Sequence, residues 1–162
     1  MRNAEPADWK IKPLPRRRTT IPLDRTFSQD ELHLLRRGLI PAQMEDKWFI
    51  YWKDDALYFH RSWTGVCIFI VHFVVEDGTG KMVRAEVRYI PKRKNPSADK
   101  ENAEMISYLI DVLLLDRARM FPSDNMTPEE SAVMSWSTVG RAMFGQHPNG
   151  VEGAGDSPPI NQ

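Results

Sequence analysis

The sequence of 162 residues contains a single cysteine, Cys67. One cysteine excludes an intramolecular disulfide framework and any zinc site built on cysteine ligands. The histidines, which lie at positions 33, 60, 72 and 147, lack the spacing of metal ligands. We therefore expect no metal and no cofactor.

Long apolar runs are missing as well. The longest, residues 66–75, is interrupted by His72 and falls short of the roughly 18–20 residues needed to cross a bilayer. No apolar segment follows Met1 in the manner of a signal peptide. These absences favour a soluble, cytoplasmic protein with no membrane partner.

Neither sign of charge is in surplus, because 22 Lys and Arg balance 22 Asp and Glu. Proteins that bind duplex DNA normally carry a basic surplus, so duplex DNA is not an expected partner. A P-loop is absent too. The glycines at 78 and 80 are typical of a hairpin turn, and no helix follows them to hold a phosphate.

Proline and arginine concentrate near the start of the chain. Proline disfavours both helices and central strands, so we predict an extended arm over residues 1–26. A single α+β domain is expected over residues 27–145. Glycine and proline dominate residues 146–162, which are predicted to be a disordered tail. The arm contains Pro6, Pro13, Pro15, Pro22 and the run Arg16-Arg17-Arg18.

Capping patterns predict three helices. Ser28 and Glu31 form a capping box, and Gly38 ends the helix that follows. A second helix with a broad apolar face follows residues 95–97 and ends before Pro122. A third is expected from Thr127 to about residue 144.

Four segments rich in β-branched and aromatic residues lie between the first two helices: residues 48–53, 56–63, 66–75 and 81–90. Turn residues at 54–55, 64–65 and 77–80 separate them, and connections this short make neighbouring strands antiparallel. The predicted fold is α+β, a four-stranded antiparallel meander packed on one face by two or three helices.

Alternation along these strands assigns their side chains to two faces. The face expected to pack on the helices carries Trp48, Ile50, Trp52, Leu57, Phe59, Trp63, Val66, Ile68, Ile70, Val74, Val83, Ala85, Val87 and Tyr89, with Arg61 and His72 as polar exceptions. The opposite face is expected to carry Phe49, Tyr51, Lys53, Tyr58, His60, Ser62, Cys67, Phe69, Val71, Phe73, Met82, Arg84, Glu86 and Arg88.

The mixture of aromatic and basic residues on this opposite face has three interpretations. Tyr51 and Tyr58 with Arg84 and Arg88 suit a platform for a planar anionic ligand, a nucleotide or single-stranded nucleic acid. Alternatively, the proline-rich arm or the third helix lies across the face. A protein partner is the third interpretation.

The residues with chemical potential cluster in one segment. His60 is a candidate general base and Ser62 a weaker candidate nucleophile, although residues two apart on a strand are about 6–7 Å apart. Arg61 has two interpretations: a buried clamp paired with Glu45 or Asp46, or a bidentate anion-binding residue.

Two strings, MEDKWFIY at 44–51 and LYFHRSWTG at 57–65, give the chain a resemblance. It resembles a group of small uncharacterised bacterial proteins that share this segment. The resemblance covers about residues 26–76 and implies a recurring unit of bacterial or phage-related proteins, without implying an activity.

The leading functional hypothesis is a binding module for a nucleotide-like or other anionic ligand, using His60, Arg61, Arg84 and Arg88 around the two tyrosines. A small hydrolase or transferase acting on a phosphate-containing or ADP-ribose-like substrate, with His60 as acid or base, is the alternative. A protein–protein interaction module or homodimer is a third.

Overall fold

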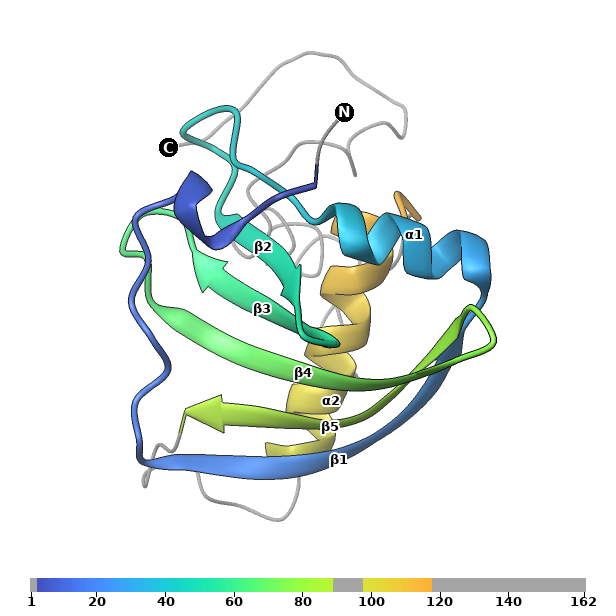
Figure 1. The fold of residues 1–162 in the computed structure, drawn as a ribbon. Helices are drawn as coiled ribbons and strands as arrows, with labels where there is room; N and C mark the ends of the chain where they lie inside the picture. Colours follow the sequence, from blue (N-terminus) through green and yellow to red (C-terminus); the bar gives the residue numbers. More distant parts are fainter. Residues whose placement is uncertain (1–2, 89–97, 118–162) are drawn as a thin grey trace, which may run out of the picture.

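The computed structural model describes residues 3–88 and 98–117. They form an α+β fold with one five-stranded antiparallel sheet in the order β1-β5-β4-β3-β2 (Figure 1). The elements are the single turn η1 (Pro6–Asp8), β1 (Arg18–Phe27), α1 (Gln29–Arg37), β2 (Trp48–Lys53), β3 (Ala56–Arg61), β4 (Cys67–Glu76), β5 (Thr79–Arg88), α2 (Ala98–Leu109) and the π-helical turn η3 (Ile110–Leu114).

The predicted number of strands was wrong by one, because β1 lies within the proline-containing stretch that the sequence favoured as an arm. Arg18 pairs with Arg88, and Phe27 pairs with Gly80. Pro22 is tolerated because β1 is an edge strand and its register shifts between Pro22 and Arg25.

The register predicted for β2 and β3 is confirmed. Trp48 lies opposite Arg61 and Ile50 opposite Phe59. The connecting residues Asp54 and Asp55 have positive φ angles of 51° and 57°, as a two-residue hairpin turn requires.

The register predicted for β3 and β4 was wrong. Phe59 lies opposite Phe69 rather than Ile70, because the register shifts between Phe59 and His60, which lies opposite Cys67. The turn from β4 to β5 also differs: Glu76 pairs with Thr79, so the turn is two residues long rather than four.

A shift of one residue moves every side chain of a strand to the other face. Phe69, Val71 and Phe73 of β4 therefore belong to the main core. Ile70 and His72, expected in that core, lie on the opposite face, where Ile70 packs in a second cluster and His72 bonds to Glu86. Trp63 and Val74, also expected in the core, are exposed, whereas Met82 is buried in it.

Helix α1 forms as its sequence dictates. The Ser28 side chain accepts a hydrogen bond from the backbone of Glu31, the Glu31 carboxylate accepts one from the backbone of Ser28, and Gly38 follows at the C-terminal end. Leu32 and Leu35 face inward and are almost fully buried. The helix thereby covers one end of the sheet.

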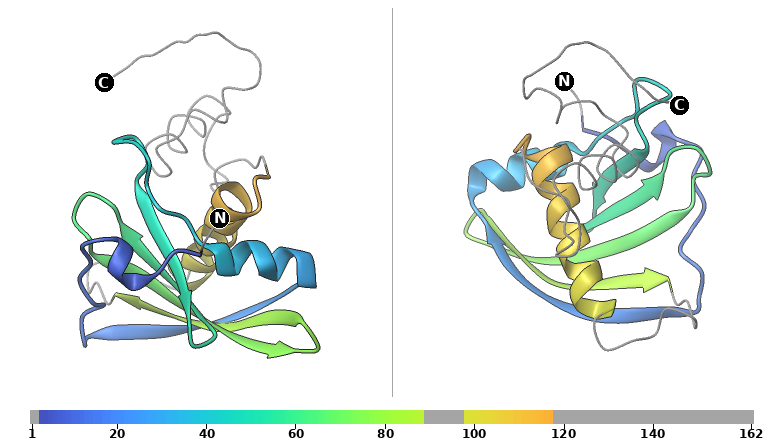
Figure 2. Two further views of the ribbon diagram at one scale, coloured as in Figure 1. Left: turned by 45° about the horizontal axis from the view of Figure 1, so that its top comes forward. Right: turned by 180° about the vertical axis from the view of Figure 1, so that it is seen from behind.

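Helix α2 crosses the rear of the sheet in the view of Figure 1, and Figure 2 (right) shows it lying across that face. Ile106, Leu109 and Ile110 are fully buried against the strands. In η3, the Asp111 carboxylate accepts hydrogen bonds from Nη2 and Nη1 of Arg25, at 2.6 and 3.2 Å. This pair ties the end of the helix to β1.

The third predicted helix, at 127–144, and the predicted tail, at 146–162, lie outside the described residues. Within the described part of the chain, no helix has both the length and the apolar character needed to cross a membrane.

Candidate ligand-binding face

The sheet face opposite α2 is called the open face below. It carries Phe49, Tyr51, Tyr58, His60, Ile70, His72, Arg84, Glu86 and Arg88. It is partly covered by residues 3–17, which we call the strap and which run along one rim of the sheet before β1 begins (Figure 1).

Backbone hydrogen bonds fix the strap to α1 and to the turn between β3 and β4. The Ala4 N–H donates to the Arg37 carbonyl at 2.9 Å, and the Lys12 N–H donates to the Gly65 carbonyl at 2.8 Å. Lys12 and Val66 also form a parallel bridge. The strap is therefore an ordered part of the fold.

Apolar contacts hold the strap against the open face. Trp9 stacks on Phe49 with ring centroids 6.0 Å apart, and Leu14 is buried in a cluster with Cys67 and Ile70. The interpretation that the N-terminal region lies across this face is thus confirmed for the strap. Tyr58 stays half-buried at its margin.

Tyr51 and Tyr58 pair directly across β2 and β3, and their rings stack with centroids 4.7 Å apart and planes within 5°. Burial, assisted by the neighbouring Tyr58 and Cys67, raises the pKa of Tyr51 to about 12. The pKa of Tyr58 is also raised, by burial and then by the charge of Asp54. Both rings are therefore neutral at physiological pH.

A chain of polar contacts crosses β4, β5 and β1 beside these rings. Glu86 accepts one hydrogen bond from Arg18 at 2.9 Å and lies 2.6 Å from His72 Nε2. Burial acts to raise the pKa of Glu86, but the hydrogen bonds and charges of His72 and Arg18 lower it overall. The carboxylate is thus ionised and already engaged with two partners.

Arg18 also joins the strap to the sheet. Its Nε donates to the Pro15 carbonyl and its Nη2 to the Leu14 carbonyl, at 2.9 and 2.7 Å. The Arg18 guanidinium therefore fixes the end of the strap next to Glu86.

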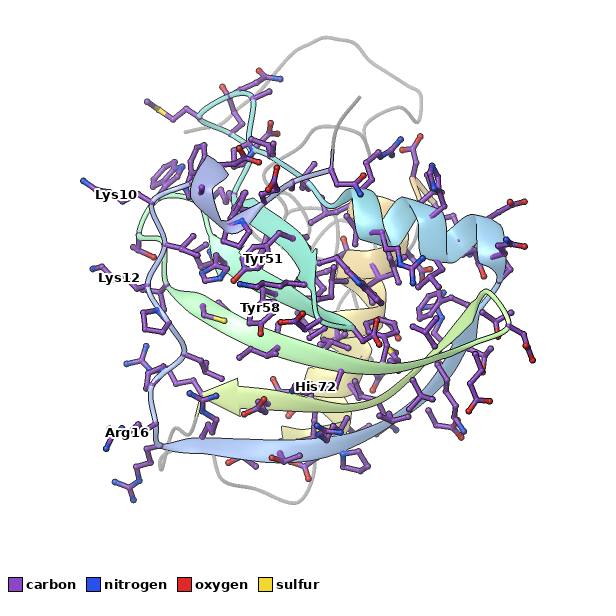
Figure 3. The ribbon with its side chains drawn as sticks, in the orientation of Figure 1. Lys10, Lys12, Arg16, Tyr51, Tyr58 and His72 are labelled. Carbon is purple, nitrogen blue, oxygen red and sulfur yellow. The ribbon has the colours of Figure 1, made fainter. Side chains whose placement is uncertain are left out.

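Exposed cations surround the open face. Arg84 and Arg88 are exposed on β5, and Lys10, Lys12 and Arg16 are exposed on the strap. Figure 3 shows the three strap cations spaced along one rim, with Tyr58 and His72 further in. Residues 9–18 contain five basic and no acidic residues.

The two predicted catalytic residues are buried and do not contact each other. His60 Nδ1 lies 2.9 Å from the Gly65 carbonyl, and the Ser62 hydroxyl donates to the Asp46 carbonyl at 2.7 Å. Burial lowers the pKa of His60, an effect that its bond to Gly65 partly opposes. Their catalytic role stays a prediction, without a base-to-nucleophile contact behind it.

Among the described residues, His60 Nε2 is a buried side-chain nitrogen without a hydrogen-bond partner. The imidazole packs between two aromatic rings. Its centroid lies 5.6 Å from the ring centroid of Tyr51 and 6.2 Å from that of Phe49. A neutral ring is the form that suits this environment.

Arg61 points away from the other predicted ligand-binding residues. Its guanidinium lies 4.7 Å from the ring centre of Trp48, on the core side of the sheet, and burial lowers its pKa. The Asp46 carboxylate accepts hydrogen bonds from the backbone of Ala42 and Gln43. The structure therefore separates Arg61 from Tyr51, Tyr58, Arg84 and Arg88, whereas it brings those four to one face.

Sequence reasoning missed His72 and the strap lysines as neighbours of this face. The run Arg16-Arg17-Arg18 was a usable signal for the strap cations, because basic runs that converge on one edge of the sheet extend the basic rim of its open face. The sequence has a second basic run, Lys92-Arg93-Lys94, which lies outside the described residues.

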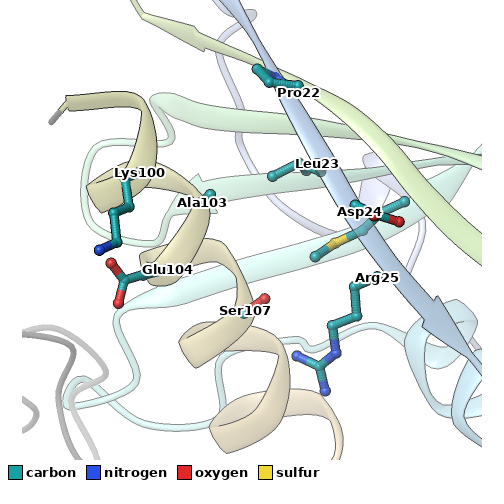
Figure 4. Close-up of a pocket in the computed structure, with 9 residues that line it drawn as sticks. Pro22, Leu23, Asp24, Arg25, Lys100, Ala103, Glu104 and Ser107 are labelled. Carbon is teal, nitrogen blue, oxygen red and sulfur yellow. The ribbon is translucent and has the colours of Figure 1, made fainter. Parts of the chain in front are cut away.

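A separate cleft of about 490 Å³ lies between β1 and α2 (Figure 4). Its walls carry two acidic and two basic side chains, and one of these, Arg25, is held by Asp111. This balance gives the cleft no preference for anions. It is lined by Pro22, Leu23, Asp24, Arg25, Met82, Lys100, Ala103, Glu104 and Ser107.

The residues that the structure describes contain no cluster of three or more His, Cys, Asp or Glu side chains able to hold a metal ion. The chain matches no protein family model, no curated protein and no solved structure. The open face is therefore interpreted from its own chemistry.

Proposed function

We propose that this protein is a binding module for a nucleotide-like anionic ligand, held on the open face between Tyr58 and Arg84. One observation carries the proposal: a neutral stacked tyrosine pair lies beside exposed arginines on a face where Glu86 is already paired. Aromatic rings that stack with bases and arginines that bind phosphate are the usual parts of such sites.

The charges near Tyr58 give the ligand a direction. Asp54 lies close enough for its charge to raise the pKa of Tyr58, so a phosphate is disfavoured on the side of the β2–β3 turn. Arg84 lies two strands away on β5, opposite His72 and therefore in line with Ala56, so its backbone is roughly 12 Å from that of Tyr58. A planar ring on Tyr58 would thus direct its anionic group toward β5.

Thermal denaturation with AMP, adenosine and inorganic phosphate tests this proposal. A ligand at 100 times its dissociation constant stabilises a protein by about 2.7 kcal/mol. AMP is expected to raise the melting temperature more than either fragment does. Arg84→Ser should abolish the AMP shift, and Tyr58→Leu should reduce it, because it removes the ring but keeps an apolar side chain.

Arg37→Ser is the matched control, since Arg37 is an exposed arginine on α1 and binds the strap through its backbone carbonyl, which the substitution keeps. Its AMP shift should equal that of the unmodified protein. The proposal is wrong if AMP gives no shift, or if Arg84→Ser and Arg37→Ser respond alike.

A further inference from the structure

The segment His60–Gly65 forms a hydrogen-bonded turn that exposes Trp63. The Ser62 N–H donates to the Lys47 carbonyl at 2.9 Å, and the Ser62 hydroxyl donates to the Asp46 carbonyl at 2.7 Å. The Gly65 N–H returns to the Arg61 carbonyl at 2.8 Å. These bonds fix the turn that carries Trp63.

Trp63 is held in place although it is exposed. The residue is 69 % exposed, yet its Nε1 donates to the Met44 carbonyl at 2.8 Å. The Lys47 ammonium lies 5.5 Å from the centre of the indole ring. An exposed ring fixed in one orientation beside a cation loses little entropy when a planar group stacks on it.

The strap connects this tryptophan to the basic rim. Trp9 Nε1 donates to the Ser62 carbonyl at 2.9 Å, and the Lys12 N–H donates to the Gly65 carbonyl. A Cβ on Gly65 would lie 2.3 Å from the Lys10 carbonyl oxygen, so strap and turn are in direct contact. Lys10 and Lys12 therefore lie beside the Trp63 turn.

The basic rim continues from the strap to the open face. Arg16 precedes Arg18, the first residue of β1. The backbone of Arg18 lies opposite that of Arg88, the last residue of β5. From Lys10 to Arg16 the chain spans at most about 20 Å. A row of cations thus runs from Trp63 along the strap to Arg88, and Arg84 lies further along β5, beyond the Glu86 carboxylate that Arg18 and His72 already bind.

We infer that the ligand is a single-stranded nucleic acid, whose backbone follows this row of cations and one of whose bases stacks on Trp63. The inference rests on the proposed function, because it extends the site at Tyr58 along the strap. A basic track with aromatic platforms is how proteins bind single strands without strong sequence preference, over about 4–16 nucleotides. The fixed Trp63 favours unpaired bases over a duplex, whose bases are already stacked.

Fluorescence anisotropy of the full chain with fluorescein-labelled oligo(dT) of 4, 8 and 12 nucleotides tests the inference. Affinity should rise with length, and a 12-base-pair duplex should bind more weakly than the 12-mer. Trp63→Ala should weaken binding of the 12-mer by about 5- to 150-fold, the range for loss of one stacked base. Trp63→Phe should retain most of the affinity.

Salt dependence separates the cations from the ring. The triple variant K10Q/K12Q/R16Q should lower the magnitude of the slope of log K against log[salt] by about 2, from about 0.7 for each phosphate contact on a single strand. The control K81Q/K100Q/R37Q removes the same charge from exposed positions elsewhere and should leave the slope unchanged.

Intrinsic fluorescence reports the stacked base directly. Oligo(dT) should quench the unmodified protein, and the quenching should be smaller in Trp63→Phe. Heparin, a polyanion without bases, is the comparison probe. Equal binding of heparin and the 12-mer without quenching would overturn the inference, as would dimerisation through Trp63 in sedimentation velocity without oligonucleotide binding.

The two proposals fail differently. If AMP stabilises the protein through Arg84 but affinity does not grow with oligonucleotide length, the inference is wrong and the proposed function is supported. If oligonucleotides bind through Trp63 while Arg84→Ser and Tyr58→Leu bind them normally, the proposed site on the open face is wrong. If neither AMP nor oligo(dT) binds, both proposals are wrong.

Discussion

Gly65 has to be glycine for two independent reasons. Its φ angle of +76° lies in the left-handed region, and a side chain there would meet the Lys10 carbonyl oxygen. Its own carbonyl receives the Lys12 N–H and faces His60 Nδ1. One residue thereby holds together the strap, the Trp63 turn and the buried histidine.

At the same scale, His60 makes stability depend on pH. Burial lowers the pKa of His60 below its ordinary 6.5, although the Gly65 bond partly opposes the shift. The unfolded chain therefore takes up the proton before the folded one does. Stability from the neutral ring is complete above about pH 6.5 and is lost as pH falls toward the folded pKa, by at most about 1.4 kcal/mol per pH unit. Urea unfolding at several pH values between about 7.5 and 5 measures the loss.

Two variants separate His60 from other titrating groups. His60→Phe keeps an aromatic ring between Phe49 and Tyr51, and its stability should vary less over this range. His33→Gln, at an exposed position on α1, should behave as the unmodified protein. The lowered pKa of Glu86 affects stability only below about pH 4.5. An unchanged slope in His60→Phe would contradict the assignment.

At the scale of elements, local chemistry made α1 and the β2–β3 hairpin predictable. The Ser28 and Glu31 side chains cap neighbouring backbone groups, and the two aspartates supply a two-residue turn. The register shift between β3 and β4 left no such mark in the sequence. The face predicted for His72 was therefore wrong, whereas alternation along the strands correctly placed Tyr51, Tyr58 and Arg84 on one face.

The strap was harder to place for a related reason. Its contacts join residues near the start of the chain to Phe49, Gly65 and Ile70, and no periodicity records such distant pairings. The candidate site was thus half predictable. Its residues on neighbouring strands follow from alternation, and its strap cations required the fold.

The reaction rate of the Cys67 thiol should report whether the strap is packed against the sheet. Cys67 is 1 % exposed under Leu14, and burial raises the pKa of the thiol to about 12. Leu14→Ala should cost about 2–5 kcal/mol and speed the reaction of Cys67 with Ellman's reagent by tenfold or more. As the chain contains one cysteine, the measured rate belongs to Cys67.

Leu109→Ala is the matched comparison, because Leu109 of α2 is fully buried in the main core and belongs to a different cluster from Leu14 and Cys67. It should destabilise the protein to a similar extent and accelerate the thiol reaction less. Equal acceleration in both variants would show that Cys67 is exposed by global unfolding rather than by release of the strap.

For the whole molecule, the order of pairing matters. β2 and β3 are joined by a two-residue turn, whereas β1 pairs with β5, which is the last of the five strands in the sequence. Contacts between distant segments carry a large loop-closure cost, so β1 is expected to join the sheet late in folding.

Two equivalent substitutions test this order. Ile50→Val lies in β2 and Ile21→Val in β1, both almost fully buried, and each should cost about 0.5–1.5 kcal/mol. Ile50→Val should slow folding, whereas Ile21→Val should mainly speed unfolding. Stopped-flow folding and unfolding rates measure both effects, and the opposite pattern would contradict a late β1.

The edge position of β1 has a consequence during synthesis. Ribosomes add about 5–20 residues per second, so roughly 3–12 seconds separate Phe27, at the end of β1, from Arg88, at the end of β5. Throughout that interval β1 has no partner strand within its own nascent chain. Pro22 and the adjacent bulge, which weaken pairing along a strand edge, then guard β1 against pairing with a neighbouring nascent copy.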